Sequence, residues 1–256
     1  MESLMIDKTP PQGAQAALRA LRLLKLFTPA KPEMKLAEVS ELAGLNKTTT
    51  HRLLQALHSE SMLDRNPADG AYRLGPALMA MGVQALASND LRLRVRPLLN
   101  RLATDTGETA TLEVPVDDSM LILDEVTGSH FVGAGGNVGT RWPMHATSTG
   151  KALIAFDEQG VGRLGEQLES MTSHTITERD RLEKQLREIR GRGFAETVDE
   201  LEDGFSGVAA VVRGGMGQVL GALSVCGPTQ RLSAERRASL GATLCAAAEH
   251  LQPRHW

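Results

Sequence analysis

Apolar residues recur with helical spacing near the start of the chain. Residues 14–27 carry a stripe at three- and four-residue steps, which predicts an amphipathic helix. Its members are Leu18, Leu21, Leu23, Leu24, Leu26 and Phe27. The preceding residues 1–13 are mostly polar and contain Pro10 and Pro11, so we expect them to form a disordered lead-in.

Two shorter helical patterns follow, with a single glycine at the turn between them. Residues 36–43 have a small apolar face, and Gly44 can supply the positive φ of a tight helix end. Asn46 then provides a good N-cap for a second helix. The inward residues of the two helices are Leu36, Val39, Leu42, Ala43, Leu53, Leu54 and Leu57. Two short helices around a tight turn predict a helix-turn-helix.

A hairpin pattern comes directly after this motif. Leu63 and residues 72–74 have strand character, and the segment 66–70, NPADG, contains the residues that favour a turn. We therefore predict a winged helix-turn-helix over 14–75. The next segment, 76–88, is largely apolar, which is typical of a buried core helix or of a linker helix that packs against a second chain.

From residue 89 onward the pattern alternates between strands and helices. Strand-like segments are expected at 108–116, 119–126, 193–198, 207–213 and 218–225. Helical segments are expected at 91–107, 148–156, 178–193 and 233–252, and the third has the inward stripe Glu178, Leu182, Leu186 and Ile189. Helices flanking a largely antiparallel sheet predict an α+β domain over 89–254.

Composition narrows the class of protein. Aromatic residues make up only 3% of the chain, so aliphatic residues must form the core. Cys226 and Cys245 lack the CxxC spacing of a zinc site, and neither a metal nor another cofactor is expected. Without an apolar run of membrane length or a signal peptide, we expect a cytoplasmic protein that contacts no membrane.

Charge is unevenly distributed along the chain. The net charge is −3, yet residues 1–75 hold 10 Lys and Arg against 8 Asp and Glu. The start of the second helix of a helix-turn-helix enters the major groove, where threonine can contact bases and where lysine or arginine can neutralise phosphates. The candidate DNA-binding residues are Asn46, Lys47, Thr48, Thr49, Thr50, His51, Arg52 and, on the wing, Arg65 and Arg73.

The stretch 142–154, WPMHATSTGKALI, contains residue types that can carry chemistry. A phosphate loop would need glycine where His145 stands and a hydroxyl residue where Ala152 stands. A hydrolase could draw on Ser148 and His145, but the GxSxG motif is missing. We therefore assign no catalytic residue. A helix start at Ser148 and Thr149 offers free N–H groups that suit a carboxylate ligand.

Several blocks of the chain together resemble the IclR family of transcriptional regulators. In the first part these are LAEVSELAGLNKTTTHRLLQAL and YRLGPALMAMG; later come PMHATSTGKALIA, GFAETVDELEDG and VLGALSVCGP. The resemblance implies a winged helix-turn-helix that binds double-stranded operator DNA as a homodimer or homotetramer. It also implies a linker helix and a GAF-like domain that binds a small effector, often an organic or aromatic acid.

The resemblance also implies an effector pocket. Its residues would be Phe131, Ala134, Trp142, Ser148, Thr149, Thr197, Phe205, Gly207, Ser224 and Cys226. Many relatives have Asp-Asp where this chain has Thr197-Val198, and a cysteine in place of Gly207, so a relative's ligand should not be transferred. The alternative is a ligand sensor or enzyme whose N-terminal domain contacts protein instead of DNA.

Overall fold

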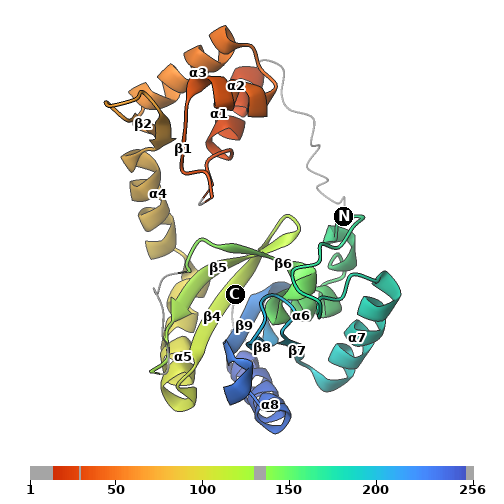
Figure 1. The fold of residues 1–256 in the computed structure, drawn as a ribbon. Coiled ribbons are helices and arrows are strands. Elements are labelled where there is room, and N and C mark those ends of the chain that lie inside the picture. Colours follow the sequence, from red (N-terminus) through yellow and green to blue (C-terminus); the bar gives the residue numbers. More distant parts are fainter. Residues whose placement is uncertain (1–13, 29, 130–136, 252–256) are drawn as a thin grey trace. The chain divides into compact units, whose positions relative to one another are not determined.

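A computed structural model describes residues 14–28, 30–129 and 137–251 (Figure 1). The chain divides between Ser88 and Asn89 into two compact units. The candidate effector residues Phe131 and Ala134 lie outside the described residues.

The first unit combines helices with a small antiparallel sheet. The helices are α1 (Gln15–Leu24), α2 (Leu36–Ala43), α3 (Lys47–Ser59) and α4 (Pro76–Ala87). The strands are β1 (Glu33–Met34), β2 (Leu63–Arg65) and β3 (Tyr72–Leu74), arranged in the order β1-β3-β2. The predicted helix-turn-helix and hairpin are confirmed, and β1 is an additional strand that the pattern did not predict.

The turn between α2 and α3 follows the predicted chemistry. Gly44 has φ +62°, and the Asn46 side chain accepts a hydrogen bond of 2.8 Å from the Thr49 N–H. The apolar stripes were predicted less accurately, because Leu21 and Leu42 are 56% and 53% exposed. In helices this short, only one narrow ridge reaches the core, and the other apolar residues remain at the surface.

Helix α4 contains no buried residue within the described chain. Met79, Met81 and Val83 are all more than half exposed, although most of this helix is apolar. Of the two interpretations of 76–88, a buried core helix is therefore wrong for the single chain. What remains is an apolar helix whose surface is not covered by the described residues.

The second unit is built on one six-stranded antiparallel sheet. Its strands are β4 (Thr109–Val116), β5 (Ser119–Val126), β6 (Arg141–Pro143), β7 (Ala195–Val198), β8 (Phe205–Arg213) and β9 (Val219–Pro228). Their order is β6-β5-β4-β9-β8-β7. The helices are α5 (Asp90–Thr106), α6 (Ser148–Phe156), α7 (Arg179–Arg192) and α8 (Ala234–His250). Short 3₁₀ turns cover Met144–Ala146, Val161–Arg163 and Thr229–Arg231.

The helices are divided between the two faces of this sheet. Helices α5 and α8 pack on one face, whereas α6 packs on the other and contacts α7 (Figure 1). Leu182, Leu186 and Ile189 of α7 are buried as predicted, but Glu178 is exposed because it is the N-cap residue preceding the helix. The predicted α+β architecture is confirmed.

Helix α6 is the most deeply buried helix of the second unit, and it contains a lysine. Lys151 is 0% exposed, and its ammonium group forms an ion pair with the Glu200 carboxylate, which is also buried. Burial lowers the pKa of Lys151, and the Glu200 carboxylate opposes that shift. An unpaired charge in this position would be strongly unfavourable, so the pair fixes α6 to the loop after β7.

We predict that Lys151→Met destabilises the second unit by about 3–5 kcal/mol, because Glu200 would keep a buried charge without a partner. The double variant Lys151→Met/Glu200→Leu should recover most of this loss. Both tryptophans, Trp142 and Trp256, follow residue 88, so fluorescence-detected urea unfolding reports on this unit. Equal losses in the single and double variants would contradict the prediction.

Candidate functional site

A cavity of about 460 Å³ lies between the sheet and the start of α6. Its walls come from β4, β5, β8 and β9, from Trp142 on β6, and from the loop that runs from Leu201 to Phe205. This volume is in the range of small-molecule sites in proteins. Cavity residues from distant parts of the chain are therefore brought together by sheet pairing.

Strand register determines which side chains form the floor of the cavity. Thr111 pairs with Ser224 on one side and with Glu125 on the other, and all three line the cavity. A parallel row pairs Gly207 with Cys226. Directly paired residues of antiparallel strands point to the same face, so both rows lie on the face of the sheet beneath α6.

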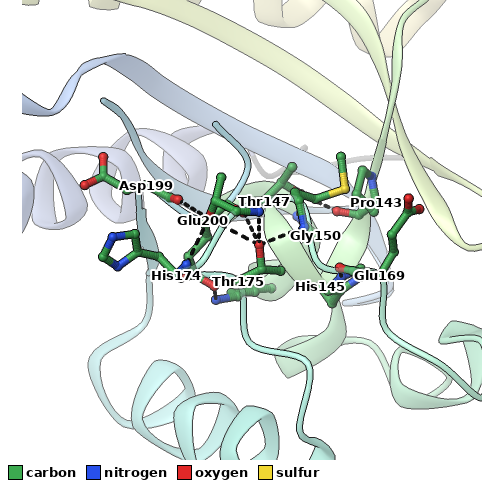
Figure 2. Close-up of polar contacts among 12 residues, drawn as sticks. Pro143, His145, Thr147, Gly150, Glu169, His174, Thr175, Asp199 and Glu200 are labelled. Atoms are coloured by element: carbon green, nitrogen blue, oxygen red, sulfur yellow. Dashed lines mark hydrogen bonds and ion pairs between the residues drawn. The ribbon is translucent and has the colours of Figure 1, made fainter. Parts of the chain in front are cut away.

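The three hydroxyl residues at the start of α6 have different roles. Thr147 is the N-cap residue, and its hydroxyl accepts a hydrogen bond of 3.1 Å from the Gly150 N–H (Figure 2). Thr149 donates to the Glu113 carboxyl at 2.7 Å. Ser148 is 5% exposed, lines the cavity, and has no hydrogen-bond partner for its hydroxyl among the described residues.

Gly207 provides the space that Ser148 occupies. A Cβ atom at position 207 would lie 2.8 Å from the Ser148 Oγ atom, which is too close for an ordinary contact. A larger residue here would push the serine away from its position. The absence of a side chain at Gly207 therefore affects the shape of the cavity beside Ser148.

Glu113 is the central cavity residue that the sequence analysis missed. Its two carboxyl oxygens accept hydrogen bonds from Thr111 at 2.9 Å and from Thr149 at 2.7 Å. The Thr111 hydroxyl also lies 2.7 Å from the Ser224 hydroxyl. Burial raises the pKa of Glu113, and the two threonine hydroxyls oppose that rise. The sequence signal that could have identified this residue was a charged side chain, Glu113, at a strand position that alternation places on the inner face of the sheet.

Three other charged groups of the cavity, Glu108, Glu125 and Arg231, are engaged with neighbours. Arg231 donates two hydrogen bonds to Glu108, at 2.8 and 2.7 Å, and holds that buried carboxylate in a bidentate pair. Asn137 donates to Glu125 at 3.0 Å. Among the described lining residues, four carry carboxyl groups and one carries a guanidinium group. The lining is therefore rich in hydrogen-bond acceptors and poor in positive charge.

Seven of the ten proposed effector residues line the cavity. They are Trp142, Ser148, Thr149, Phe205, Gly207, Ser224 and Cys226. Thr197 is buried but does not line the cavity. It lies on the outer strand β7, where it pairs with Gly207 of β8, and α6 packs against β7. Burial raises the pKa of the Cys226 thiol, which favours its neutral form.

His145 does not belong to the cavity. Its Nε2 atom lies 2.8 Å from the Glu169 carbonyl oxygen, so the ring fixes a neighbouring loop (Figure 2). In the same region the Thr175 hydroxyl donates to the Glu200 carbonyl oxygen at 2.7 Å. These contacts hold the backbone on both sides of α6. They give His145 a structural role.

A buried carboxylate joins the sheet to α5, the first helix of the second unit. Asp124 is 1% exposed and accepts a hydrogen bond of 2.7 Å from Arg96. Arg92 lies 3.4 Å from the same carboxylate, and Arg96 also donates to the Glu125 carbonyl oxygen at 3.1 Å. The strand that carries Glu125 into the cavity is thus tied directly to α5.

The proposed DNA-binding residues at the start of α3 do not all face solvent. Lys47, Thr48, His51 and Arg52 are exposed, as is the cap residue Asn46, while Thr49 is half-buried. Thr50 is fully buried, and its hydroxyl donates to the Asn46 carbonyl oxygen at 3.0 Å. Thr50 therefore supports the turn of the motif, and its proposed contact with DNA is wrong.

The two arginines of the wing differ in their surroundings. Arg73 donates to Asp64 at 2.7 Å and to Glu33 at 3.4 Å, so carboxylates already compensate its charge. Arg65 is exposed, and its guanidinium group lies 5.8 Å from the centre of the Tyr72 ring. Arg65 is consequently the better candidate for a phosphate contact.

The described residues contain neither a metal-binding cluster nor a membrane-spanning helix. No group of three or more histidine, cysteine, aspartate or glutamate residues there could hold a metal ion. None of the helices in the described ranges is both long enough and apolar enough to span a membrane.

Comparison with protein families gives two matches that together cover most of the chain. Residues 16–67 match the IclR helix-turn-helix domain. Residues 83–252 match the C-terminal domain of the bacterial transcriptional regulator IclR. The two units thus correspond to two domains that are found together in known regulators.

Individual relatives agree with these matches. The HTH-type transcriptional regulator XynR of Escherichia coli is 34% identical over 221 residues, covering 85% of this chain and 88% of that protein. A structure of an IclR-type regulator from a Silicibacter species is 27% identical, with a TM-score of 0.81 over 92% of this chain and 94% of that one. A structure of an IclR homologue from Microbacterium hydrocarbonoxydans, complexed with 4-hydroxybenzoate, shares the fold at 24% identity. The TM-score is 0.75, and the match covers 92% of this chain and 98% of that one.

We predict that Thr149→Val destabilises the second unit by about 1–3 kcal/mol, because one oxygen of the buried Glu113 carboxyl would lose its donor. Thr149→Ser keeps the hydroxyl and should cost less than about 1 kcal/mol. Urea unfolding followed by tryptophan fluorescence measures both effects. A serine variant as unstable as the valine variant would show that the methyl group matters more than the hydrogen bond.

Proposed function

The chain belongs to the IclR family of DNA-binding transcriptional regulators, and from this premise we propose a specific division of labour between its two units. The first unit binds double-stranded operator DNA through the start of α3 and through the wing. The second unit binds a small organic acid in the cavity beneath α6. Binding of that effector changes the affinity of the protein for its operator.

The exposed start of α3 is the observation that carries the DNA-binding proposal. Lys47 and Arg52 place positive charge beside the hydroxyl groups of Thr48 and Thr49, at the helix end that enters the major groove in this motif. Phosphate contacts by such cations release counterions, so binding weakens steeply as salt concentration rises. Arg65 extends the positive surface onto the wing.

The cavity supports the effector proposal. It contains the free hydroxyl of Ser148 and the N-terminal end of α6, where N–H groups and the helix dipole favour an anionic group. An effector changes operator affinity only if it binds the competent and incompetent arrangements with unequal affinity. The ion pairs of Asp124 with α5 offer a direct physical connection from the cavity wall to the helix that follows the linker.

Helix α4 supports self-association. Its exposed residues Met79, Met81 and Val83 would be covered by the same helix of a second copy, giving a homodimer that can pair further into a homotetramer. A dimer presents two recognition helices to two half-sites. We therefore propose that α4, within the linker segment 76–88, sets the distance between the two DNA-binding units of the dimer.

The alternative function is that of a ligand sensor or enzyme whose first unit contacts protein instead of DNA. The matched relatives are transcriptional regulators, which disfavours both versions of that alternative. Because the target is operator DNA, we propose that the protein works in the cytoplasm. Salt-sensitive, sequence-preferring binding to DNA is the property that a protein-contact domain would lack.

Arg52→Ala should weaken binding to operator DNA by about tenfold and reduce the salt dependence by about one phosphate contact. Fluorescence anisotropy with the DNA upstream of the protein's own gene, at several salt concentrations, measures both quantities. Arg187→Ala, on the exposed surface of α7, is the matched control and should bind like the wild type. Equal effects of the two substitutions, or no sequence preference in the wild type, would refute the proposed DNA-binding surface.

Val83→Lys should dissociate the dimer, because a charged side chain would have to be buried where α4 meets its partner. Sedimentation velocity would show the shift towards a monomer, and operator affinity should fall with it. Gln84→Lys tests the effect of added charge at a polar position of the same helix. If Val83→Lys leaves the mass of the assembly unchanged, α4 is not the dimer contact.

A further inference from the structure

The polar groups of the cavity restrict the chemistry of the effector beyond its being an organic acid. Glu113, Thr111 and Ser224 form one connected cluster on the cavity floor, through contacts of 2.9 and 2.7 Å. Thr149 joins that cluster to the start of α6 at 2.7 Å. This cluster, which we call the acceptor floor, combines a carboxyl group with hydroxyls in a single hydrogen-bond network.

The acceptor floor has capacity to accept more hydrogen bonds than the protein supplies. A carboxylate offers about four lone-pair sites, and the donors to Glu113 among the described residues are the hydroxyls of Thr111 and Thr149. Glu125, on the neighbouring strand, accepts from Asn137 and adds further acceptor oxygen to the cavity. Each oxygen of Glu113 already has one donor and can accept a further one, so a ligand that brings its own donors gains hydrogen bonds on this floor.

The charges of the lining argue in the same direction. An anionic ligand without donor groups would face the carboxyl groups of Glu113 and Glu125, and the guanidinium group of Arg231 is already paired with Glu108. Burial raises the pKa of Glu113, which reduces its repulsion of a ligand carboxylate, and even the protonated group keeps an acceptor oxygen for a ligand hydroxyl. The floor thus tolerates an acid but discriminates by hydrogen bonding.

Ser148 supplies the complementary contact. Its hydroxyl is almost completely buried, lines the cavity and has no partner among the described residues, and Gly207 leaves the space around it open. It stands at the start of α6, directly before the Thr149 that donates to Glu113. A donor for a ligand carboxylate therefore lies next to an acceptor for a ligand hydroxyl.

We infer that the effector is a hydroxylated organic acid, that its hydroxyl group donates to Glu113 on the acceptor floor, and that its carboxylate binds at Ser148. This inference rests on the proposed effector function of the cavity. Glu113 then becomes the residue that determines specificity. It discriminates against acids of similar size that lack a hydroxyl, because such acids displace water from the remaining acceptor sites of its carboxyl group without replacing that hydrogen bond.

The test compares acids that differ only in hydroxyl groups. The probes are three pairs: lactate with propionate, gluconate with hexanoate, and 4-hydroxybenzoate with benzoate. Dissociation constants come from the fluorescence of Trp142, which lines the cavity, and thermal shift provides a second measurement. For at least one pair the hydroxylated member should bind the full-length protein at least about tenfold more tightly, a factor that corresponds to one lost hydrogen bond.

Two variants assign this preference to Glu113. In Glu113→Leu the ratio of dissociation constants for that pair should fall to less than about threefold, and the loss should come from weaker binding of the hydroxylated acid. Glu113→Gln keeps the size of the side chain, should fold even if the leucine variant does not, and should lower the ratio by at least about threefold. A ratio unchanged in either folded variant overturns the inference.

The remaining outcomes separate this inference from the proposed function. If propionate, hexanoate or benzoate binds as tightly as its partner in every pair that binds, or if no hydroxylated acid binds, the inference is wrong. Ser148→Leu, which fills the cavity, should abolish binding of every probe. Operator affinity measured with and without each probe tests effector function separately, since a hydroxyl preference without any change in operator affinity would refute only that function.

Discussion

The cavity of the second unit depends on one buried charge, that of Lys151. A lysine ammonium removed from water needs an anionic partner, and Glu200 provides it. Because Lys151 lies on α6 and Glu200 immediately precedes the loop from Leu201 to Phe205, their pairing fixes two walls of the cavity relative to each other. The hydrogen bond of Thr175 to the Glu200 backbone adds a second restraint on that loop.

The start of α6 shows how a short polar segment can serve structure and binding at once. Thr147 satisfies the helix end, Thr149 satisfies the buried Glu113, and Ser148 is left to face the cavity. Each hydroxyl has a different neighbour, although the three residues are consecutive in the chain. Position along the helix, more than residue type, decides which hydroxyl is left without a protein partner inside the cavity.

Much of the first unit could be predicted because its signals are local. The tight turn at Gly44, the cap at Asn46 and the polar turn of the hairpin each involve residues close in sequence. The inward assignment failed at Leu21 and Leu42, and the DNA-facing assignment failed at Thr50. A helical period does not specify where the boundary of the core falls, and only the packing of α1, α2, α3 and the wing against one another determines this.

For the second unit, the sequence by itself determined five of the six strands, the helices and seven of the twenty residues that line the cavity, because alternation, helix caps and family resemblance depend on the order of residues along the chain. Tertiary structure alone decided the rest. The hydrogen-bond partners of Glu113 are Thr111 on β4 and Thr149 on α6. Thr111 in turn contacts Ser224 on β9, more than 100 residues away. The same holds for Glu108 with Arg231. Strand pairing creates these contacts. The hydrogen bonds and the burial that set the pKa and the binding properties of each side chain exist only once the strands have paired.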